Sequence, residues 1–498
     1  MKLSPLLTVA LILTTCIAVW GVVDTQGLAS VAASIVAQQF ESRAWFIMLT
    51  VSTMLVLSFA LAVSKYGNIV LGRDGDKPEF SAISWMTMLF AAGMGVGLLY
   101  WGTAEPLTHF LIVKESEVPV EAASAALFVT YFHWGLHAWA IYALTGLVIA
   151  FFSFRLGCPT LVSAPILKVY GSSAVTRLVG WLCDLLAIVA IAIGLGGSVA
   201  MGVFQIEEGV QALFGLDQSS GVLRYTIFFV LCGAFLPPLL VDLGRGMALL
   251  SNIAMATAAG LLVFILLTGP TAFLMSTIVQ GFGEYISGAL AHGFKTFTFL
   301  DEKATSWFQS WTLTYMVWWL AWAPFVGVFI ARISRGRTIR EFIAGVILAP
   351  TGFSVVWFGV FGGVGFHSAL RTDLPILEVV RDSVSQVTFF VLEQFPAPSL
   401  TIALVVVAAF LFLVTSVVSA AFVLGMFSTN GDLNPSRTVK LAWGVVLGAL
   451  GLVMILSDSI DAVKSIIALG ALPFVFVVLV LIVCLIRALQ AEKGSSDG

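Results

Sequence analysis

Charged residues are scarce in this chain. Asp, Glu, Lys and Arg make up 10% of its 498 residues, whereas hydrophobic residues make up 59%. A water-soluble protein cannot cover its surface with that composition, so the soluble globular classes are excluded. The formal net charge is only −3, and we identify no basic face that would bind nucleic acid. The composition predicts an integral membrane protein without a nucleic-acid partner.

Cysteine is also rare. The five cysteines occur singly, at spacings that match no metal-ligand or disulfide motif: Cys16, Cys158, Cys183, Cys232 and Cys484. Three of them fall in long apolar stretches and two lie near the ends of such stretches, where cysteine serves as a small packing residue. We therefore expect neither a disulfide bond nor a cysteine metal site.

Long apolar stretches, by contrast, are abundant. Runs of at least 17 residues without Asp, Glu, Lys or Arg number twelve: 3–23, 44–64, 80–104, 122–154, 185–206, 225–241, 246–283, 304–331, 342–370, 394–431, 441–457 and 465–486. About 20 apolar residues cross a bilayer core as a helix. We predict an all-α protein with twelve transmembrane helices, in which the two longest runs also contain loop or re-entrant residues. The first run could be a secretory signal, but its length and Trp20 favour a span.

Lys and Arg are distributed unevenly between the two sides of this arrangement. If the amino terminus is placed inside, the inner connections hold 16 of the 24 positive residues and the outer connections hold 8. Positive residues concentrate in cytoplasmic connections of membrane proteins. Both termini are therefore predicted to lie in the cytoplasm.

No soluble domain is expected. The predicted parts are two leading helices, a first group of five spans, an outer connection, a second group of five spans and a short cytoplasmic tail: 1–72, 80–276, 277–303, 304–488 and 489–498. Apolar residues recur at near-helical spacing from Ile278 to Leu290, as in an amphipathic helix on the membrane surface. A loop folded over the spans would give the same pattern. The tail is too short for a regulatory domain.

Two predicted spans differ from the others. The third contains GMGVG, with Gly93, Gly95 and Gly97 at alternate positions, and the eighth contains Pro324. Glycine costs about 1 kcal/mol against Ala inside a helix. These glycines either let another helix pack closely or expose backbone groups that would suit an anion. Interrupted helices at matching positions mark the substrate site of transporters with inverted repeats, so we predict that spans 3–7 and 8–12 are such repeats.

Aromatic residues cluster in the fourth and eighth spans. Residues 311–322 hold four tryptophans and a tyrosine at three- and four-residue steps, and the fourth span carries Trp134, Trp139 and Tyr142. Membrane tryptophans usually lie at the bilayer surface or in a core where the N–H needs a partner, yet Trp139 and Trp319 lie near mid-span. We favour an aromatic cage that binds a quaternary ammonium group. The uncharged spans contain no carboxylate, so recognition of an amine by a buried ion pair is not expected.

A membrane-embedded enzyme is a competing class. His133 and His137 are four residues apart, which is a spacing of metal ligands on a helix. No acidic residue lies in that span and no third ligand is evident, so packing or hydrogen bonding is favoured for both histidines. We expect that the protein is not an enzyme. A channel or a non-transporting sensor is a third class.

Two blocks of the sequence resemble the betaine/carnitine/choline transporter (BCCT) family. They are GMGVGLLYWGTAEP and WWLAWAPFVGVFIARISRGRTIREF, and the likeness runs through nearly the whole chain. The resemblance implies a LeuT-type fold with two leading helices, in the bacterial inner membrane. It implies import of an onium solute such as betaine, choline, carnitine or dimethylsulfoniopropionate, driven by sodium or protons or by sodium-independent exchange. It also implies a homotrimer formed through a helix like 278–290.

The resemblance assigns roles to individual residues. The cage of the family resembles Trp134, Trp139, Tyr142 and Trp319, with Trp318 and Trp322 along the same pathway. The glycine-rich backbone that would meet the substrate carboxylate comprises Gly93, Met94, Gly95 and Gly97. A sodium site between the third and tenth spans resembles Ala91, Met94, Phe412, Thr415 and Ser416. Hydroxyls at Thr415 and Ser416 suit sodium, which prefers oxygen ligands, although they could equally bond to their own helix. No cofactor is expected apart from sodium as the coupling ion.

The chain also departs from the family. Ile191 and Leu195 stand where some relatives carry two threonines for a second ion, and only Ser198 offers a hydroxyl nearby. A second sodium site is therefore not expected. Thr314 and Met316 stand where relatives often have aromatic residues, so the cage would be looser, with Met316 as a soft neighbour for methyl groups. The short tail makes osmotic activation through a tail domain unexpected.

Overall fold

The computed structural model describes residues 4–93, 95–113, 119–216, 221–241 and 244–494. Within these ranges the protein is helical, and its only β-type pairing is an isolated bridge between Val70 and Thr338. The all-α prediction is thus confirmed for the part of the chain that the structure describes.

The first half of the chain forms α1 (Pro5–Val23), α2 (Thr25–Val63), α3 (Ala82–Gly93), α4 (Val96–Val113), α5 (Pro119–Trp134), α6 (Leu136–Ala150), α7 (Ala164–Tyr170), α8 (Ala174–Phe214), α9 (Val222–Phe235) and α10 (Gly244–Thr268). The second half forms α11 (Thr271–His292), α12 (Glu302–Phe308), α13 (Thr314–Ile333), α14 (Ile339–Arg371), α15 (Ile376–Asp382), α16 (Val387–Leu392), α17 (Pro398–Ser428), α18 (Arg437–Leu456), α19 (Ile460–Ala471) and α20 (Phe474–Gly494). Tighter or wider turns lie between them: η1 (Lys65–Asn68), η2 (Phe151–Arg155), η3 (Pro237–Leu240), η4 (Gln309–Leu313) and η5 (Val384–Gln386).

Eleven helical segments in the described ranges are long and apolar enough to cross a membrane. The predicted span 80–104 is not among them, because α3 ends at Gly93 and α4 begins at Val96. The helix is therefore interrupted inside the GMGVG sequence, and Gly95 lies in the bend. The two pieces α3 and α4 together cover the length of the missing span, so the count of twelve stays a prediction.

The longest uncharged runs include residues outside the spanning helices, as expected. The run 246–283 contains nearly all of α10, a turn at Gly269 and Pro270, and the first half of α11. The run 394–431 contains α17 and short flanking segments at each end. In both cases charge alone does not mark where a helix stops, because uncharged turn residues continue the run.

The eighth predicted span is not interrupted at Pro324, and this part of the prediction is wrong. The proline lies inside α13, which is continuous from Thr314 to Ile333 after a π-type turn at η4. A proline removes one backbone hydrogen bond but neighbouring helices can hold a membrane helix together around it. Here α6 crosses α13 at two glycines, where a Cβ on Gly146 would lie 3.3 Å from the Gly327 carbonyl oxygen.

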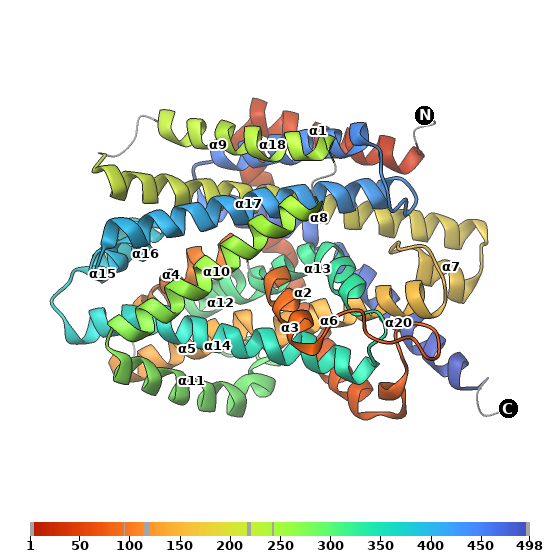
Figure 1. Ribbon diagram of the computed structural model, residues 1–498, viewed down its shortest axis with the longest axis horizontal. Coiled ribbons are helices and arrows are strands. Elements are labelled where there is room, and N and C mark those ends of the chain that lie inside the picture. The colour runs from red at the N-terminus through yellow and green to blue at the C-terminus, as the bar shows by residue number, and fades with distance from the viewer. Residues whose placement is uncertain (1–3, 94, 114–118, 217–220, 242–243, 495–498) are drawn as a thin grey trace.

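The outer connection forms a helix rather than a loop. It is α11, which begins at Thr271 and runs along one edge of the molecule in Figure 1. Tyr285 and Ala289 are buried, whereas one stripe of apolar side chains is exposed: Val279, Phe282, Ile286 and Leu290. The near-helical spacing of its apolar residues thus belongs to a two-sided helix, with one face on the protein and one apolar face outside it.

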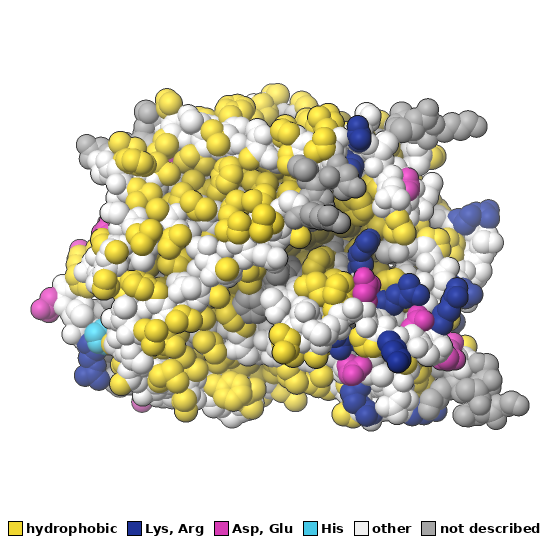
Figure 2. Space-filling view, viewed as in Figure 1, with side chains coloured by type: hydrophobic (Ala, Val, Ile, Leu, Met, Phe, Trp, Pro, Cys, Tyr) yellow, Lys and Arg dark blue, Asp and Glu magenta, His cyan; other side chains and the backbone are white. Residues whose placement is uncertain are grey.

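Both termini lie at the same end of the molecule (Figure 1). Most of the Lys and Arg side chains visible in Figure 2 gather at this end, while apolar side chains cover the middle of the same face. At the charged end, Arg155 pairs with Asp74 and donates to Glu492 at 2.7 Å, which ties the loop before α3 to α20. The Arg155 guanidinium lowers the pKa of the Asp74 carboxyl through this hydrogen bond.

Candidate functional site

A cavity lies between α4, the α5–α6 junction, α8, α13 and α17. Its empty volume is about 700 Å³, including space open to solvent. Pockets that bind small molecules have mostly apolar walls with a few polar groups, and the residues that line this cavity are of that kind. The lining residues are Gly95, Val96, Gly97, Trp101, Trp134, Tyr142, Leu195, Ser198, Val199, Met201, Tyr315, Trp318, Trp319, Trp322, Leu413, Ser416 and Val417.

The interrupted third span supplies one wall. Gly95 and Gly97 line the cavity on either side of the start of α4. A Cβ on Gly97 would lie 3.2 Å from the ring of Trp134, which is closer than ordinary van der Waals contact. Glycine at this position therefore lets the Trp134 ring lie directly against the backbone of α4. Gly93 ends α3, and Met94 lies outside the described residues.

A second interruption aims Trp134 at the cavity. The residue is the last of α5, and Gly135 separates α5 from α6. A Cβ on Gly135 would lie 2.2 Å from the hydroxyl of Tyr285 and 2.5 Å from the Tyr131 carbonyl oxygen, so only glycine fits. The Leu136 N–H donates to the Tyr285 hydroxyl at 2.7 Å. The buried Tyr285 of α11 thus holds the α5–α6 junction in place.

Aromatic rings from α5, α6 and α13 meet in the cavity wall. The Trp319 ring lies 5.6 Å from Trp134 and 4.9 Å from Tyr142, measured between ring centroids, and its plane is steeply inclined to both. Trp318 and Trp322 line the same cavity. Two of the predicted residues do not line it. Trp139 lies behind the wall, 6.0 Å from Trp319 and 5.6 Å from Tyr142, and Met316 is fully buried elsewhere in α13.

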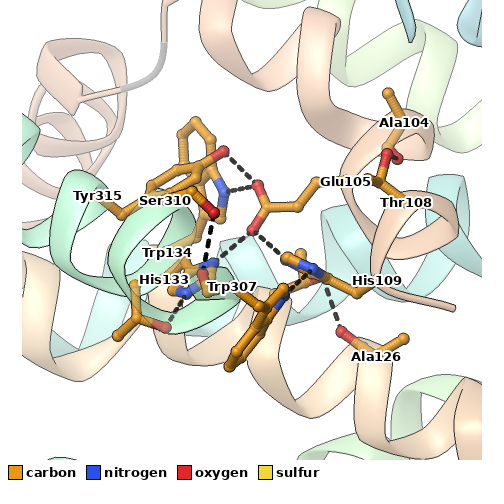
Figure 3. A network of polar contacts seen from close by, with 12 residues as sticks. Ala104, Glu105, Thr108, His109, Ala126, His133, Trp134, Trp307, Ser310 and Tyr315 are labelled. Atoms are coloured by element: carbon orange, nitrogen blue, oxygen red, sulfur yellow. Dashed lines mark hydrogen bonds and ion pairs between the residues drawn. The ribbon is translucent and has the colours of Figure 1, made fainter. Parts of the chain in front are cut away.

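A buried carboxylate lies behind the aromatic wall, contrary to the expectation from the uncharged runs. Glu105 is inaccessible to solvent, and its Oε2 accepts a hydrogen bond from Trp134 Nε1 at 2.8 Å and another from the Tyr315 hydroxyl (Figure 3). Its Oε1 lies 2.7 Å from His133 Nδ1. Two rings of the cavity are therefore fixed by one carboxylate.

The run without charges ends at residue 104, but α4 continues to Val113. Glu105 is therefore a buried carboxylate within a helix of a membrane protein, and buried ionisable residues of this kind are functional candidates. Two signals could have identified it. The residue stands inside the GTAEP block, and His109 follows it at the four-residue spacing that places both side chains on one helix face.

Glu105 is part of a group with His109 and His133, whose ligand-type atoms all lie within 4.8 Å of one another. His137, which stands at metal-ligand spacing from His133 in the sequence, is not in this group. A ligand at His109 would use Nε2, which faces Glu105 Oε1 at 3.4 Å. The Trp307 indole N–H donates to His109 Nδ1 at 3.3 Å, so the proton of a neutral imidazole is on Nε2. His109 Nε2 lies at ion-pair distance from the carboxylate without a hydrogen bond to it, whereas His133, Trp134 and Tyr315 are hydrogen-bonded to Glu105.

The predicted sodium ligands lie partly within the described structure. Ser416 lines the main cavity together with Gly95, and Phe412 lines a small neighbouring cavity that also touches Gly95. The Thr415 hydroxyl donates to the carbonyls of Leu411 and Phe412 at 3.0 and 3.1 Å, which leaves its lone pairs available. Met94 lies outside the described residues, as does the side chain of Ala91 in α3. The donor set that is described, two hydroxyls and backbone carbonyls, fits a sodium ion. The Ser198 hydroxyl donates to the Gly194 carbonyl at 3.3 Å.

Known proteins are similar in sequence to this chain over nearly its full length. The family model for betaine/carnitine/choline transporters matches residues 5–494. The glycine betaine transporter OpuD of Bacillus subtilis is 37% identical over 495 residues, which cover 99% of this chain and 95% of that protein. The osmo-independent choline transporter BetT1 of Acinetobacter baylyi is 36% identical, with 90% and 86% covered. An ectoine/hydroxyectoine transporter of Virgibacillus pantothenticus is 33% identical, with 91% and 90% covered.

These matches extend over helices, cavity and termini alike, and they are to transporters rather than enzymes. The chain belongs to the betaine/carnitine/choline transporter family.

Proposed function

We propose that the protein is a secondary active transporter that imports an onium solute, bound among the rings of Trp134, Tyr142 and Trp319. The observation that carries this proposal is the cavity wall itself. Three rings from separate helices turn toward one space of about 700 Å³, with centroids 4.9 and 5.6 Å from that of Trp319. The attraction between an aromatic ring face and a desolvated cation contributes about 2 kcal/mol or more to binding. Relatives that carry glycine betaine, choline and ectoine support the same substrate class.

The groups that would receive the rest of the solute are hydrogen-bond donors. Trp101 and Trp322 line the cavity, and neither indole N–H has a partner among the described residues. The backbone at Gly95 and Gly97 adjoins the same space. An oxygen-bearing end of the solute, either a carboxylate or a hydroxyl, would accept hydrogen bonds from these groups.

The membrane arrangement is part of the proposal. Eleven long apolar helices together with the pair α3 and α4 would make twelve crossings, and an even number of crossings is supported by two termini at one end of the molecule. The concentration of Lys and Arg at this end supports a cytoplasmic location for both termini in the bacterial inner membrane. Within these crossings, spans 3–7 and 8–12 would form the inverted repeats of a LeuT-type fold. The exposed apolar stripe of α11 would supply the contact of a homotrimer.

Sodium is proposed as the coupling ion, held near Gly95 by Thr415, Ser416 and backbone carbonyls including those of Ala91, Met94 and Phe412. The nearness of Phe412 and Ser416 to Gly95 supports this location. The alternative is a proton-coupled carrier or a sodium-independent exchanger of the same solutes. The buried network of Glu105, His109 and His133 supports the proton-coupled alternative, because carboxylate and imidazole groups can take up and release protons.

Uptake by purified protein in proteoliposomes tests the proposal. Labelled glycine betaine or choline should accumulate with saturable kinetics when a sodium gradient is applied, and accumulation should stop when the gradient is dissipated. Accumulation driven by a proton gradient without sodium, or exchange without any gradient, would identify the alternative. Conductance without saturable uptake would contradict a transporter of either kind.

A further inference from the structure

A buried lysine lies next to the cavity, outside the residues assigned so far. Lys464 belongs to α19 and is only 7% exposed. Its Nζ lies 3.8 Å from the centroid of the Trp311 ring and 5.2 Å from that of Trp101. Because Trp101 lines the cavity, a single ring separates the ammonium group from the proposed solute.

The ion-pair partner of Lys464 stabilises the buried ammonium charge only weakly. Asp461 precedes it by about one helical turn, with 3.8 Å between Lys464 Nζ and Asp461 Oδ1, but this carboxylate is 90% exposed. An exposed partner is screened by water and stabilises a buried charge only weakly. A second carboxylate, that of Glu105, is inaccessible to solvent, unlike that of Asp461.

Contacts connect the two buried charges. Lys464 lies over Trp311, whose ring is 4.6 Å from that of His109, and His109 faces Glu105. Among the described residues packed here, the other titratable groups are Tyr100, His109, His133, Tyr315 and the exposed Asp461. The charges of a Glu105 carboxylate and a Lys464 ammonium group are opposite in sign and offset each other. A cavity with Glu105 alone would carry a net negative charge and would favour solutes with a net positive charge.

We propose that Lys464 is a specificity-determining residue whose charge offsets that of Glu105, so that the cavity prefers onium zwitterions to onium cations. The inference rests on the proposed function and narrows its substrate class to solutes that carry a carboxylate as well as an onium group. The unpartnered N–H groups of Trp101 and Trp322 agree with it, because such donors bind a carboxylate more strongly than a hydroxyl.

The test compares two solutes with the same trimethylammonium group. Glycine betaine carries a carboxylate and choline carries a hydroxyl, so the ratio of their dissociation constants reports the net charge of the cavity and cancels changes in the cage. A unit charge about 10 Å away at an effective dielectric constant of about 20 changes affinity roughly tenfold. The ratio is measured by tryptophan fluorescence and by uptake in proteoliposomes.

Five variants of the full chain are compared with the unaltered protein. Lys464→Met should shift the ratio toward choline about tenfold, whereas Lys464→Arg should leave it unchanged. Glu105→Gln should shift it toward betaine, and Glu105→Gln combined with Lys464→Met should restore the original ratio. Asp461→Asn serves as the control for an exposed charge and should leave the ratio unchanged.

A wild-type preference for choline, or an unchanged ratio in Lys464→Met, would overturn the inference while leaving onium transport intact. If Lys464→Met elutes as an aggregate in size-exclusion chromatography, Glu105→Gln decides: a shift toward betaine supports the charge balance and no shift overturns it. If the unaltered protein binds neither solute, the proposed function itself fails.

Discussion

The indole N–H of Trp134 donates a hydrogen bond to the Glu105 carboxylate at 2.8 Å. The donor belongs to α5 and the acceptor to α4, and the same carboxylate also binds the Tyr315 hydroxyl of α13. Three helices that form the cavity wall are therefore linked through one buried charge (Figure 3). The ring that faces the solute on one side is anchored on the other.

Glu105→Ala should therefore damage both stability and binding. Removal of the carboxylate leaves Trp134 Nε1, the Tyr315 hydroxyl and His133 Nδ1 without this partner, and an uncompensated buried group costs about 1–3 kcal/mol. We expect a melting temperature several degrees lower and weaker binding of glycine betaine, as measured by thermal unfolding in detergent and by fluorescence titration. Glu105→Gln retains one acceptor oxygen and should lose less stability. Equal melting temperatures for Glu105→Ala and the unaltered protein would show that the carboxylate is not a structural anchor.

Trp319→Ala should remove the central ring of the cage. Loss of a desolvated cation–π contact of about 2 kcal/mol corresponds to an affinity roughly 30-fold weaker. Trp139→Ala should also weaken binding, although less directly, because its ring supports Tyr142 and Trp319 from behind. Equilibrium binding of glycine betaine and choline measures both effects. Trp45→Ala is the matched control, since Trp45 is 58% exposed on α2 and far from the cavity lining. Undiminished affinity in Trp319→Ala would refute the cage.

Gly97→Val should weaken binding by pushing the Trp134 ring away from α4. Even a Cβ at this position would approach the ring to 3.2 Å, and the two further methyl groups of Val enlarge the overlap. We expect an affinity about tenfold lower, because overpacking of this kind typically costs 1–3 kcal/mol. Gly352→Val in α14 is the control, since no atom lies within 4 Å of a Cβ built there. An unaltered affinity in Gly97→Val would place the Trp134 ring outside the binding surface.

Thr415→Ala combined with Ser416→Ala should abolish the sodium dependence of uptake. Both hydroxyls are proposed ligands, and alanine removes them without adding bulk. Uptake is measured as a function of sodium concentration at a fixed concentration of glycine betaine. Thr401→Ala provides a control in the same helix, because its hydroxyl bonds to the Pro398 carbonyl near the start of α17. Sodium stimulation that persists in the double variant would exclude this site.

The sequence was a good guide to where helices occur and which rings meet. The aromatic residues of 311–322 recur at three- and four-residue steps, which indicated a shared helix face. The resemblance assigned Trp134, Trp139, Tyr142, Trp318, Trp319 and Trp322 to one pathway, and all of them except Trp139 line one cavity. Spacing of this kind can be seen in the sequence alone, because an α-helix has 3.6 residues per turn and residues three or four apart share a face. The helical outer connection is local in the same sense, since its apolar stripe is readable from the chain alone.

What could not be predicted depends on contacts between distant parts of the chain. Glu105 was missed because a charge was taken as the end of a span, yet its oxygens contact groups 28, 29 and 210 residues away. The continuity of α13 through Pro324 likewise depends on the close crossing of Gly146 and Gly327. Lys464 likewise faces the protein interior, where its ammonium group lies over the rings of Trp101 and Trp311.

The hydroxyl of Tyr285 connects the periphery of the molecule to its centre. It is carried by α11, whose opposite face is apolar and exposed, and it holds the residue that follows Gly135. Trp134 directly precedes that glycine, so the tilt of an inner ring depends on the seating of an outer helix. A displacement of α11 by contacting lipid or protein would therefore move the backbone two residues from Trp134. Such a displacement would change the affinity of the cavity for the solute.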